Sequence, residues 1–299
     1  MFFDSQSLIK SNTMSTEASM FKTPEGQARY FAAYDETLAL WNVPIEAIEI
    51  ETRFGTTHVN VCGSKDAPPL VLLPGAAISS TMWYPNAKAL STDYRLYAID
   101  VIGDMGKSVL TNQLKNPSDY AEWLVEVLDS LQIKQTHVLG ISLGGFLALN
   151  FTLQKQERVL KLILLSPATL LSIRPKLFFN IAIAIFVPFL SPKFRQELFL
   201  GMASPHSAPA IKQLFTPNDF QYKMFLPKVF RDEQLKEINV PTLLLLGERE
   251  VIYNPEKALK RAKRLIRNIE ADIIPNAGHA INLDQPEIIN QRILDFLKK

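Results

Sequence analysis

The chain has 299 residues, of which 47% are hydrophobic and 21% are charged. This apolar content excludes an intrinsically disordered chain and is enough for a sizeable core, while 12 glycines exclude a collagen-like repeat. The net charge is +2, from 32 Lys and Arg against 30 Asp and Glu, so no strong field indicates a nucleic-acid partner. The single cysteine, Cys62, excludes an internal disulfide and a cysteine-built zinc site.

The first residues do not show the pattern that is typical of a secretory signal peptide. The chain begins MFFDSQS, with neither a basic start nor an apolar run of signal-peptide length. The most apolar stretch, residues 177–190, is interrupted by Asn180 and Pro188 and is shorter than the ~20 residues of a membrane-spanning helix. We therefore expect a cytoplasmic protein without stable membrane insertion. A membrane-associated hairpin is the alternative for the interval from Pro167 to about Asn239, which contains this stretch.

Helix-like and strand-like segments alternate along most of the chain. After a polar segment, residues 1–20, a helix is expected from about Phe21 to Trp41, followed by a β-hairpin that turns at Gly55. Short continuous apolar runs come next, and these are typical of parallel strands buried on both faces. The expected strands are Ala47–Arg53, Thr57–Cys62, Leu70–Leu73, Leu96–Ile99, Val138–Ile141, Leu160–Leu165 and Thr242–Leu246.

Helical patterns, such as Tyr120–Leu131 and the closing Pro286–Leu297, separate these runs and predict an α/β, doubly wound sheet. One interval, from Pro167 to about Asn239, has no clean strand and is rich in proline. We interpret it as a helical cap over the carboxyl edge of the sheet, where such folds bind ligands. The expected organisation is an N-terminal extension with a helix at 1–44, a core at 45–168 and 240–299, and a cap at 169–239.

The strongest local signal is GISLG at residues 140–144, between the strand Val138–Ile141 and a helix expected over Gly145–Gln154. The pattern G-x-S-x-G between a strand and a helix predicts a sharp turn that presents a nucleophilic serine. Ser142 would then lie at a helix N-terminus, where the dipole and free N–H groups stabilise negative charge. A glycine-rich turn without chemistry is the alternative.

A serine hydroxyl is a weak nucleophile until a base accepts its proton, so a histidine is expected close to Ser142. The chain offers four: His58, His137, His206 and His279. We select His279, because it follows the strand-like run Asp272–Ile274 and a loop there can reach back over the serine. The other three are interpreted as surface or structural residues.

The base in turn needs a carboxylate that holds its tautomer and stabilises the imidazolium. The strand Thr242–Leu246 is followed by GEREVIYNP, which places Glu250 at the carboxyl edge, in the chain order Ser, Glu, His. Glu248 is the rival. No Asp or Glu occurs between Arg158 and Arg195, so the preceding strand offers no acid.

These motifs together resemble the α/β-hydrolase superfamily, in its capped serine carboxylesterase type, from about residue 45 to the end. PGAA at 74–77 resembles the family's oxyanion loop, and Trp83 stands where such sequences often carry an aromatic residue. DVIGDMGKS at 100–108 resembles the loop after the fourth strand, and Gly278-His279 followed by LDQPE resembles the histidine loop. The resemblance implies a mostly parallel eight-stranded sheet flanked by helices, with an inserted helical cap.

The resemblance also implies acyl transfer through Ser142, without a metal or organic cofactor, and an oxyanion held by the backbone N–H groups of Ala76 and Leu143. The chain departs from the family's pattern in two places. Pro74 stands where a histidine usually precedes the glycine, which leaves open how the oxyanion loop is braced. The acid, Glu250, is a glutamate where aspartate is commoner.

The substrate class is indicated only by the cap. No charged residue occurs between Lys176 and Lys193, so we expect a small, uncharged and fairly hydrophobic ester of short to medium chain length. Trp83 and Phe186 are candidates for the pocket. The same motifs occur in slow-turnover ligand receptors or stress-signalling regulators, lactonases and C–C hydrolases, which stay as alternatives. The oligomeric state cannot be read from the sequence.

Two further patterns invite a functional interpretation. GDMGKS at 103–108 ends like a phosphate-binding loop, but Val101 stands where that motif needs a glycine. The helix expected over Glu256–Arg267 carries a row of cations that could face phosphates. We interpret it as a solvated outer helix packed on the sheet by its apolar side.

Overall fold

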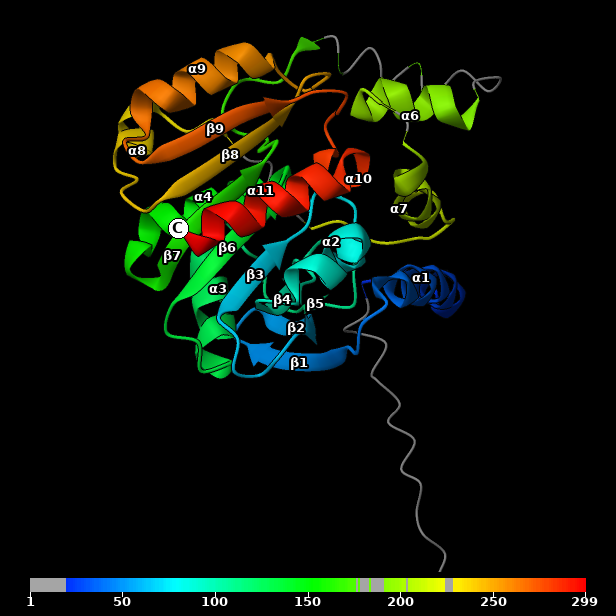
Figure 1. Cartoon of the computed structure of the whole chain (residues 1–299). Coiled ribbons are helices and arrows are strands. Elements are labelled where there is room, and N and C mark those ends of the chain that lie inside the picture. The colour runs from blue at the N-terminus through cyan, green and yellow to red at the C-terminus, as the bar shows by residue number, and fades with distance from the viewer. Residues whose placement is uncertain (1–19, 176, 178–182, 184–190, 203, 224–227) are drawn as a thin grey trace, which may run out of the picture.

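The structure is a computed structural model that describes residues 20–175, 177, 183, 191–202, 204–223 and 228–299. Within these ranges a mixed sheet of nine strands forms the centre of the molecule, in the order β1-β2-β4-β3-β6-β7-β8-β9, with β5 paired to β2 (Figure 1). The strands are β1 Glu46–Thr52, β2 Gly55–Cys62, β3 Pro69–Leu73, β4 Arg95–Ile99, β5 Val109–Leu110, β6 Thr136–Ile141, β7 Val159–Leu165, β8 Thr242–Gly247 and β9 Ile269–Ile274.

The sheet is parallel from β4 to β9 in this order, and only the pairs that involve β2 are antiparallel. The prediction of a mostly parallel sheet is therefore confirmed. The seven expected strands and the strand-like run Asp272–Ile274 form its main path, and β5 is the addition, since two residues are too short to show a pattern. Because the carboxyl ends of parallel strands share one edge, the loops after β3, β6, β8 and β9 converge there.

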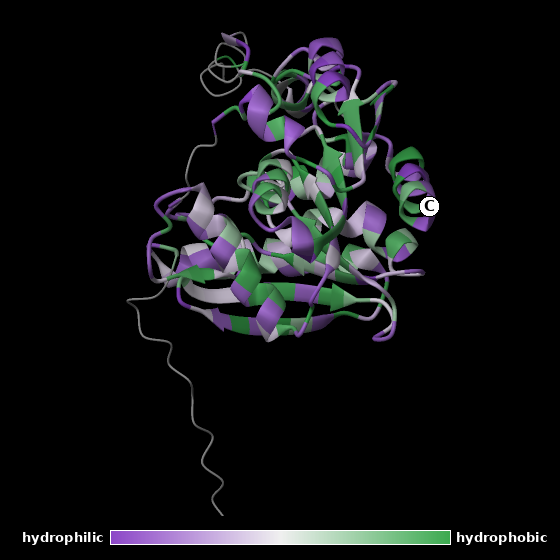
Figure 2. Ribbon diagram, turned by 90° about the vertical axis from the view of Figure 1, so that its left-hand side faces the viewer, coloured by the Kyte–Doolittle hydropathy of each residue, from purple (hydrophilic) through white to green (hydrophobic). Residues whose placement is uncertain are grey.

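Both faces of the sheet are buried, which explains why its strands read as continuous apolar runs. Along β3, Leu70 and Leu72 face one core, and Val71 and Leu73 face the other. Figure 2 shows these central strands as hydrophobic ribbons between helices that also carry hydrophilic residues. One core is covered by α2 Tyr84–Leu90 and α11 Pro286–Lys298, the other by α3 Pro117–Ser130, α4 Leu143–Gln154 and α9 Pro255–Leu265.

The segment between β7 and β8 contributes short helices and no sheet strand in its described part. These are α6 Pro192–Leu200, η5 Pro205–Ser207, α7 Ala208–Leu214 and α8 Asp232–Lys236. Figure 1 shows α6 and α7 beyond the carboxyl ends of the strands, beside α10 Ile281–Asp284. The placement agrees with a cap over the site, while the domain boundaries stay a prediction. None of the helices that the structure describes is long and apolar enough to cross a bilayer.

The N-terminal helix α1, Pro24–Leu38, continues into the 3₁₀ turn η2, Ala39–Trp41. Thr23 caps its start by accepting the Gly26 N–H, and proline occupies the first helical position, where no donor is needed. Tyr30 and Tyr34 are fully buried, and the Tyr30 hydroxyl accepts a hydrogen bond from Gln213 of α7. Helix α1 therefore supports the helices inserted between β7 and β8.

Candidate active site

Ser142 lies between β6 and α4 with φ 53° and ψ −113°, a left-handed conformation that costs energy for a residue with a side chain. The turn is possible because glycines stand two residues before and two residues after Ser142. A Cβ at Gly140 would lie 2.1 Å from the Gly144 carbonyl oxygen, and one at Gly144 would lie 2.0 Å from the Leu73 carbonyl oxygen. The serine is thereby presented at the N-terminus of α4.

His279 joins Ser142 to Glu250 through both of its ring nitrogens. The Nε2 atom lies 2.8 Å from Ser142 Oγ, and Nδ1 lies 2.8 Å from Glu250 Oε2. Because the carboxylate accepts a hydrogen, Nδ1 carries the proton and Nε2 is left to accept the serine hydroxyl. The three residues predicted from sequence thus meet, although they lie on loops after β6, β8 and β9.

Of the two candidate acids, Glu250 contacts His279 and its rival Glu248 does not. The Glu250 side chain is fully buried, and its second oxygen accepts the Ile252 N–H at 2.8 Å, so the carboxylate has a fixed orientation. Glu248 is exposed and accepts the Asn276 N–H instead. A buried carboxylate is a stronger partner for an imidazolium than an exposed one, since water screens it less.

The other histidines are engaged elsewhere. His58 bonds the Glu49 carboxylate; burial by itself lowers its pKa, but Glu49 and the Asp100 charge raise it overall. Burial and the Lys161 charge lower the pKa of His137 to about 4, which keeps that ring neutral. His206 is an exposed residue of η5. These placements agree with the structural roles expected for them.

The predicted oxyanion donors flank the serine. Leu143 is the first residue of α4, so its N–H has no helical partner, and Ala76 lies on the loop after β3. That loop approaches the nucleophile closely, since a Cβ built on Gly75 would lie 3.6 Å from Ser142 Cβ. Sequence reasoning missed the group that holds this loop, the Asp104 carboxylate, whose oxygens accept the Ala77 N–H at 3.0 and 3.1 Å.

Two buried carboxyl groups near the site have perturbed acidity. Burial raises the pKa of Asp104 to about 7, and the Asp100 charge adds to this, against hydrogen bonds from Met105 and Ala77. Burial also raises the pKa of Asp284 to about 6, although the Gly278 N–H and the nearby His279 oppose it. The Asp284 carboxylate accepts the N–H of Gly278, the residue directly before His279, at 2.8 Å.

A cavity of about 250 Å³ opens beside Ser142 and His279. Apart from these two residues its lining is apolar, with contributions from the oxyanion loop, α6, α7 and α10. The other lining residues are Gly75, Ala76, Ile78, Met82, Ile141, Leu177, Phe199, Leu200, Ala210, Ile211, Leu214, Ile252, Ala280 and Leu283.

Of the two residues expected in this pocket, Trp83 lies elsewhere and Phe186 lies outside the described residues. Trp83 is fully buried in the core beneath α2 and α11, because it follows Met82 in the 3₁₀ turn η3, Ser80–Trp83, and consecutive residues of a turn point in different directions. Met82 is the one that lines the cavity.

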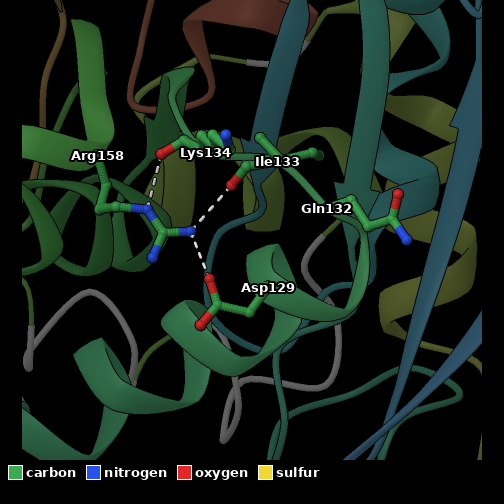
Figure 3. Close-up of a pocket in the computed structure, with 5 residues that line it drawn as sticks. All are labelled: Asp129, Gln132, Ile133, Lys134 and Arg158. Carbon is green, nitrogen blue, oxygen red and sulfur yellow. Dashed lines mark hydrogen bonds and ion pairs between the residues drawn. The ribbon is translucent and has the colours of Figure 1, made fainter.

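A second hollow, of about 490 Å³, lies at the opposite edge of the sheet (Figure 3). There the Arg158 guanidinium donates to the Asp129 carboxylate at 2.7 Å and to the carbonyls of Ile133 and Lys134. Within the described ranges, no group of three or more His, Cys, Asp or Glu residues is arranged to hold a metal ion.

Comparison with known families supports this geometry. The family model described as alpha/beta hydrolase fold matches residues 68–286, which is more than half of the chain. The chain belongs to the α/β-hydrolase fold family. The carboxylesterase YbfK of Bacillus subtilis is 38% identical over 299 residues, covering 95% of this chain and 98% of that protein.

A second Bacillus subtilis relative, the uncharacterized carboxylesterase nap, is 42% identical over 90% of this chain and 92% of its own length. Solved structures agree with these similarities. The crystal structure of naproxen esterase from the same organism superposes with a TM-score of 0.82 at 40% identity, covering 92% of this chain and 99% of that one. The crystal structure of carboxylesterase CesB (YbfK) from Bacillus subtilis superposes with a TM-score of 0.81, covering 91% of this chain and 98% of that one.

Proposed function

We propose that the protein hydrolyses short- to medium-chain, hydrophobic carboxylic esters through an acyl-enzyme formed on Ser142. That it is a carboxylesterase follows from its relatives, which carry this activity in their names and align over nearly their whole length. The observation that supports the mechanism is the continuous hydrogen-bonded chain from Ser142 through His279 to the buried Glu250.

In the first half-reaction, Ser142 Oγ attacks the ester carbonyl carbon while His279 Nε2 accepts the hydroxyl proton. Glu250 stabilises the imidazolium that results. The Ala76 and Leu143 N–H groups bind the oxygen that becomes negative. When the C–O bond of the ester breaks, His279 returns the proton to the leaving alcohol, and the acyl group stays on Ser142.

In the second half-reaction a water molecule replaces the alcohol. His279 accepts one proton from water while the hydroxide adds to the acyl carbon. When the bond between Ser142 Oγ and the acyl carbon breaks, His279 returns that proton to Ser142 Oγ, which releases the carboxylic acid and restores the serine hydroxyl. The same two N–H groups bind the oxyanion again. Each turnover consumes one ester and one water and yields one acid and one alcohol.

The cavity supports the substrate class. Its volume, about 250 Å³, lies below the ~300–1,000 Å³ typical of sites for drug-sized ligands, and the described residues that line it include no Asp, Glu, Lys or Arg. An uncharged acyl chain of modest length fits these walls. A cytoplasmic location stays a prediction.

The test is a series of p-nitrophenyl esters from acetyl to long acyl chains, assayed with the wild type and Ser142→Ala. We expect sustained turnover, best for short to medium chains, and a loss on the order of 10⁶-fold in kcat in the variant. A phosphonate ester should add one covalent group to the wild type and none to Ser142→Ala, by mass spectrometry.

Ser130→Ala is the matched control, because Ser130 is an exposed residue at the end of α3 and should keep full activity. Turnover that survives in Ser142→Ala, or phosphonate labelling of another residue, would refute the assigned nucleophile. Labelling of Ser142 without turnover would favour a ligand receptor.

A further inference from the structure

The loop that presents Ala76 contains a residue in an unfavourable conformation. Ala77 has φ 59°, in the left-handed region that residues with a Cβ rarely adopt. Such a conformation persists only where the surroundings fix it. The residue before the loop's glycine is Pro74, which has neither an N–H nor a side-chain donor, so it offers no hydrogen-bond donor that could do this.

The fixing group comes from the neighbouring strand. Since β3 and β4 are parallel neighbours, the loops after them lie at the same edge of the sheet. Asp104, on the loop after β4, directs both carboxylate oxygens to the Ala77 N–H, and Oδ1 also accepts the Met105 N–H at 2.8 Å. The side chain is buried, with 1% of the residue exposed. Hydrogen bonds to a carboxylate are roughly twice as strong as those to a neutral acceptor.

We propose that Asp104 is a positioning residue for the oxyanion loop: by holding the Ala77 N–H, its carboxylate aims the adjacent Ala76 N–H at the oxyanion formed on Ser142. The inference rests on the proposed function, because it takes Ala76 as an oxyanion donor. Asp100 also holds this segment: its carboxylate accepts the N–H of Ser80, three residues after Ala77, at 2.8 Å.

No cation neutralises Asp104 in the described part of its surroundings. The charged and titratable groups that act on it are Asp100, Tyr30 and Tyr222, and burial together with the Asp104 charge raises the pKa of both tyrosines. Lys107, on the same loop, pairs with Asp35 instead, at 2.7 Å. Asp104 therefore gains a proton at a much higher pH than an ordinary aspartate, and a protonated carboxyl is the weaker acceptor.

Ionisation of Asp104 also opposes folding. Its pKa in the folded protein, about 7, lies above the ~3.9 of an unfolded chain, so the folded state holds the extra proton between these values. The free energy of unfolding contributed by this group is highest at low pH and falls as pH rises through that window. For a carboxylate whose charge stabilised the folded protein, the free energy of unfolding would instead rise with pH. The direction of this pH dependence therefore separates a positioning role from a stabilising role.

The experiment compares Asp104→Asn, Asp104→Ala and the remote control Asp129→Ala. Asparagine keeps the shape but has a single acceptor oxygen, and alanine has none. We expect kcat to fall roughly 10- to 100-fold in Asp104→Ala, with KM changed less than about threefold, since a misaimed donor affects the transition state and not the apolar cavity. The inhibition constant of an alkyl boronic acid, which forms a tetrahedral anion on the serine, should weaken by the same factor.

Asp104→Asn should lose activity and gain thermal stability together. Its melting temperature should exceed that of the wild type by more at about pH 8 than at about pH 5, because only the wild type carries the buried charge. The ratio of wild-type to Asp104→Asn kcat/KM should shrink as pH falls through 7, as protonated Asp104 comes to resemble asparagine.

A ratio that does not change with pH, or losses confined to KM and melting temperature, would overturn the positioning role. Asp129→Ala should match the wild type in kcat, because Asp129 contacts Arg158 at the far edge of the sheet (Figure 3). Failure of the proposed function looks different: a wild type in which phosphonate does not label Ser142, whatever the Asp104 variants do.

Discussion

The carboxyl edge of the sheet and the segment inserted between β7 and β8 are built in different ways. The loops of Ser142 and Glu250 follow β6 and β8, whose residues are all buried, and the loop of His279 follows the edge strand β9, which is partly buried. The inserted helices are short, and Phe194 and Phe215 on them are 45% and 54% exposed. The chemistry thus stands on the rigid part of the fold, while the less buried part forms the cavity wall. Such a division lets the wall vary without displacing the triad.

The two regions nevertheless touch at the catalytic histidine. The His279 N–H donates to the Leu200 carbonyl, the last of α6, at 2.6 Å. At the next residue, a Cβ built on Gly201 would lie 2.0 Å from the Arg249 carbonyl oxygen, on the loop that carries Glu250. The end of α6 therefore packs against both the histidine loop and the glutamate loop. The comparison predicts that changes at the sheet edge abolish chemistry, and changes in the insertion alter binding and stability.

The largest effect after loss of the nucleophile is expected for Glu250→Gln. A neutral amide cannot stabilise the imidazolium, and it can select the wrong histidine tautomer, so kcat should fall roughly 10³- to 10⁴-fold. Glu248→Gln is the matched control and should retain nearly full activity, since Glu248 is exposed and contacts only a loop N–H. Equal losses in both variants, measured with the p-nitrophenyl series, would show that the acid has been misassigned.

The triad could be predicted from sequence because each member follows a strand that its apolar run makes visible. Ser142 also has flanking glycines whose role is local, and the chain order of the three residues limits the choices. Asp104 could not be found in this way. Its partner Ala77 lies 27 residues away, and the pairing depends on β3 and β4 being neighbours in the sheet.

The basic helix also shows that contacts between distant parts of the chain cannot be predicted from local sequence. We expected the cations of Glu256–Arg267 to be solvated, and for Arg261 this is wrong. Its side chain is 15% exposed and donates to the carbonyls of Leu170 and Phe230 and to Asp232. Helical spacing separates an apolar from a polar face, but it does not tell which cation will meet backbone carbonyls brought in from the insertion.

A change at the contact between the two regions should have the next largest effect. A Cβ at Gly278 would lie 2.0 Å from the Leu200 carbonyl oxygen, so Gly278→Ala must displace either α6 or the histidine loop. Since a shift of about 1 Å in a catalytic group can cost on the order of 100-fold, we expect kcat to fall by that order. The phosphonate should label Ser142 correspondingly slowly. If Gly278→Ala kept the wild-type kcat but had a raised KM, the added methyl group would have displaced α6 and left His279 in place.

The smallest effect is expected at the root of the insertion. Arg261 bonds Leu170, which lies shortly after β7, and Phe230, which lies shortly before α8, so one guanidinium ties together the two ends of the inserted segment. Arg261→Ala leaves those carbonyls without this donor, at a cost of about 1–3 kcal/mol in the free energy of unfolding. The cavity wall should loosen, raising KM a few-fold, while kcat and phosphonate labelling stay close to wild type.

Arg264→Ala provides the control, because Arg264 lies one turn from Arg261 on α9, is 65% exposed and bonds only the Asp232 carboxylate. An exposed ion pair contributes about 0–1 kcal/mol, so urea unfolding should separate the two variants. If the two substitutions lower the free energy of unfolding equally, the positive charge of the helix stabilises the insertion, and the hydrogen bonds of Arg261 to Leu170 and Phe230 do not. If Arg261→Ala lowers kcat as strongly as Gly278→Ala, the triad depends on the insertion as much as on the sheet, and the division between the two regions does not hold.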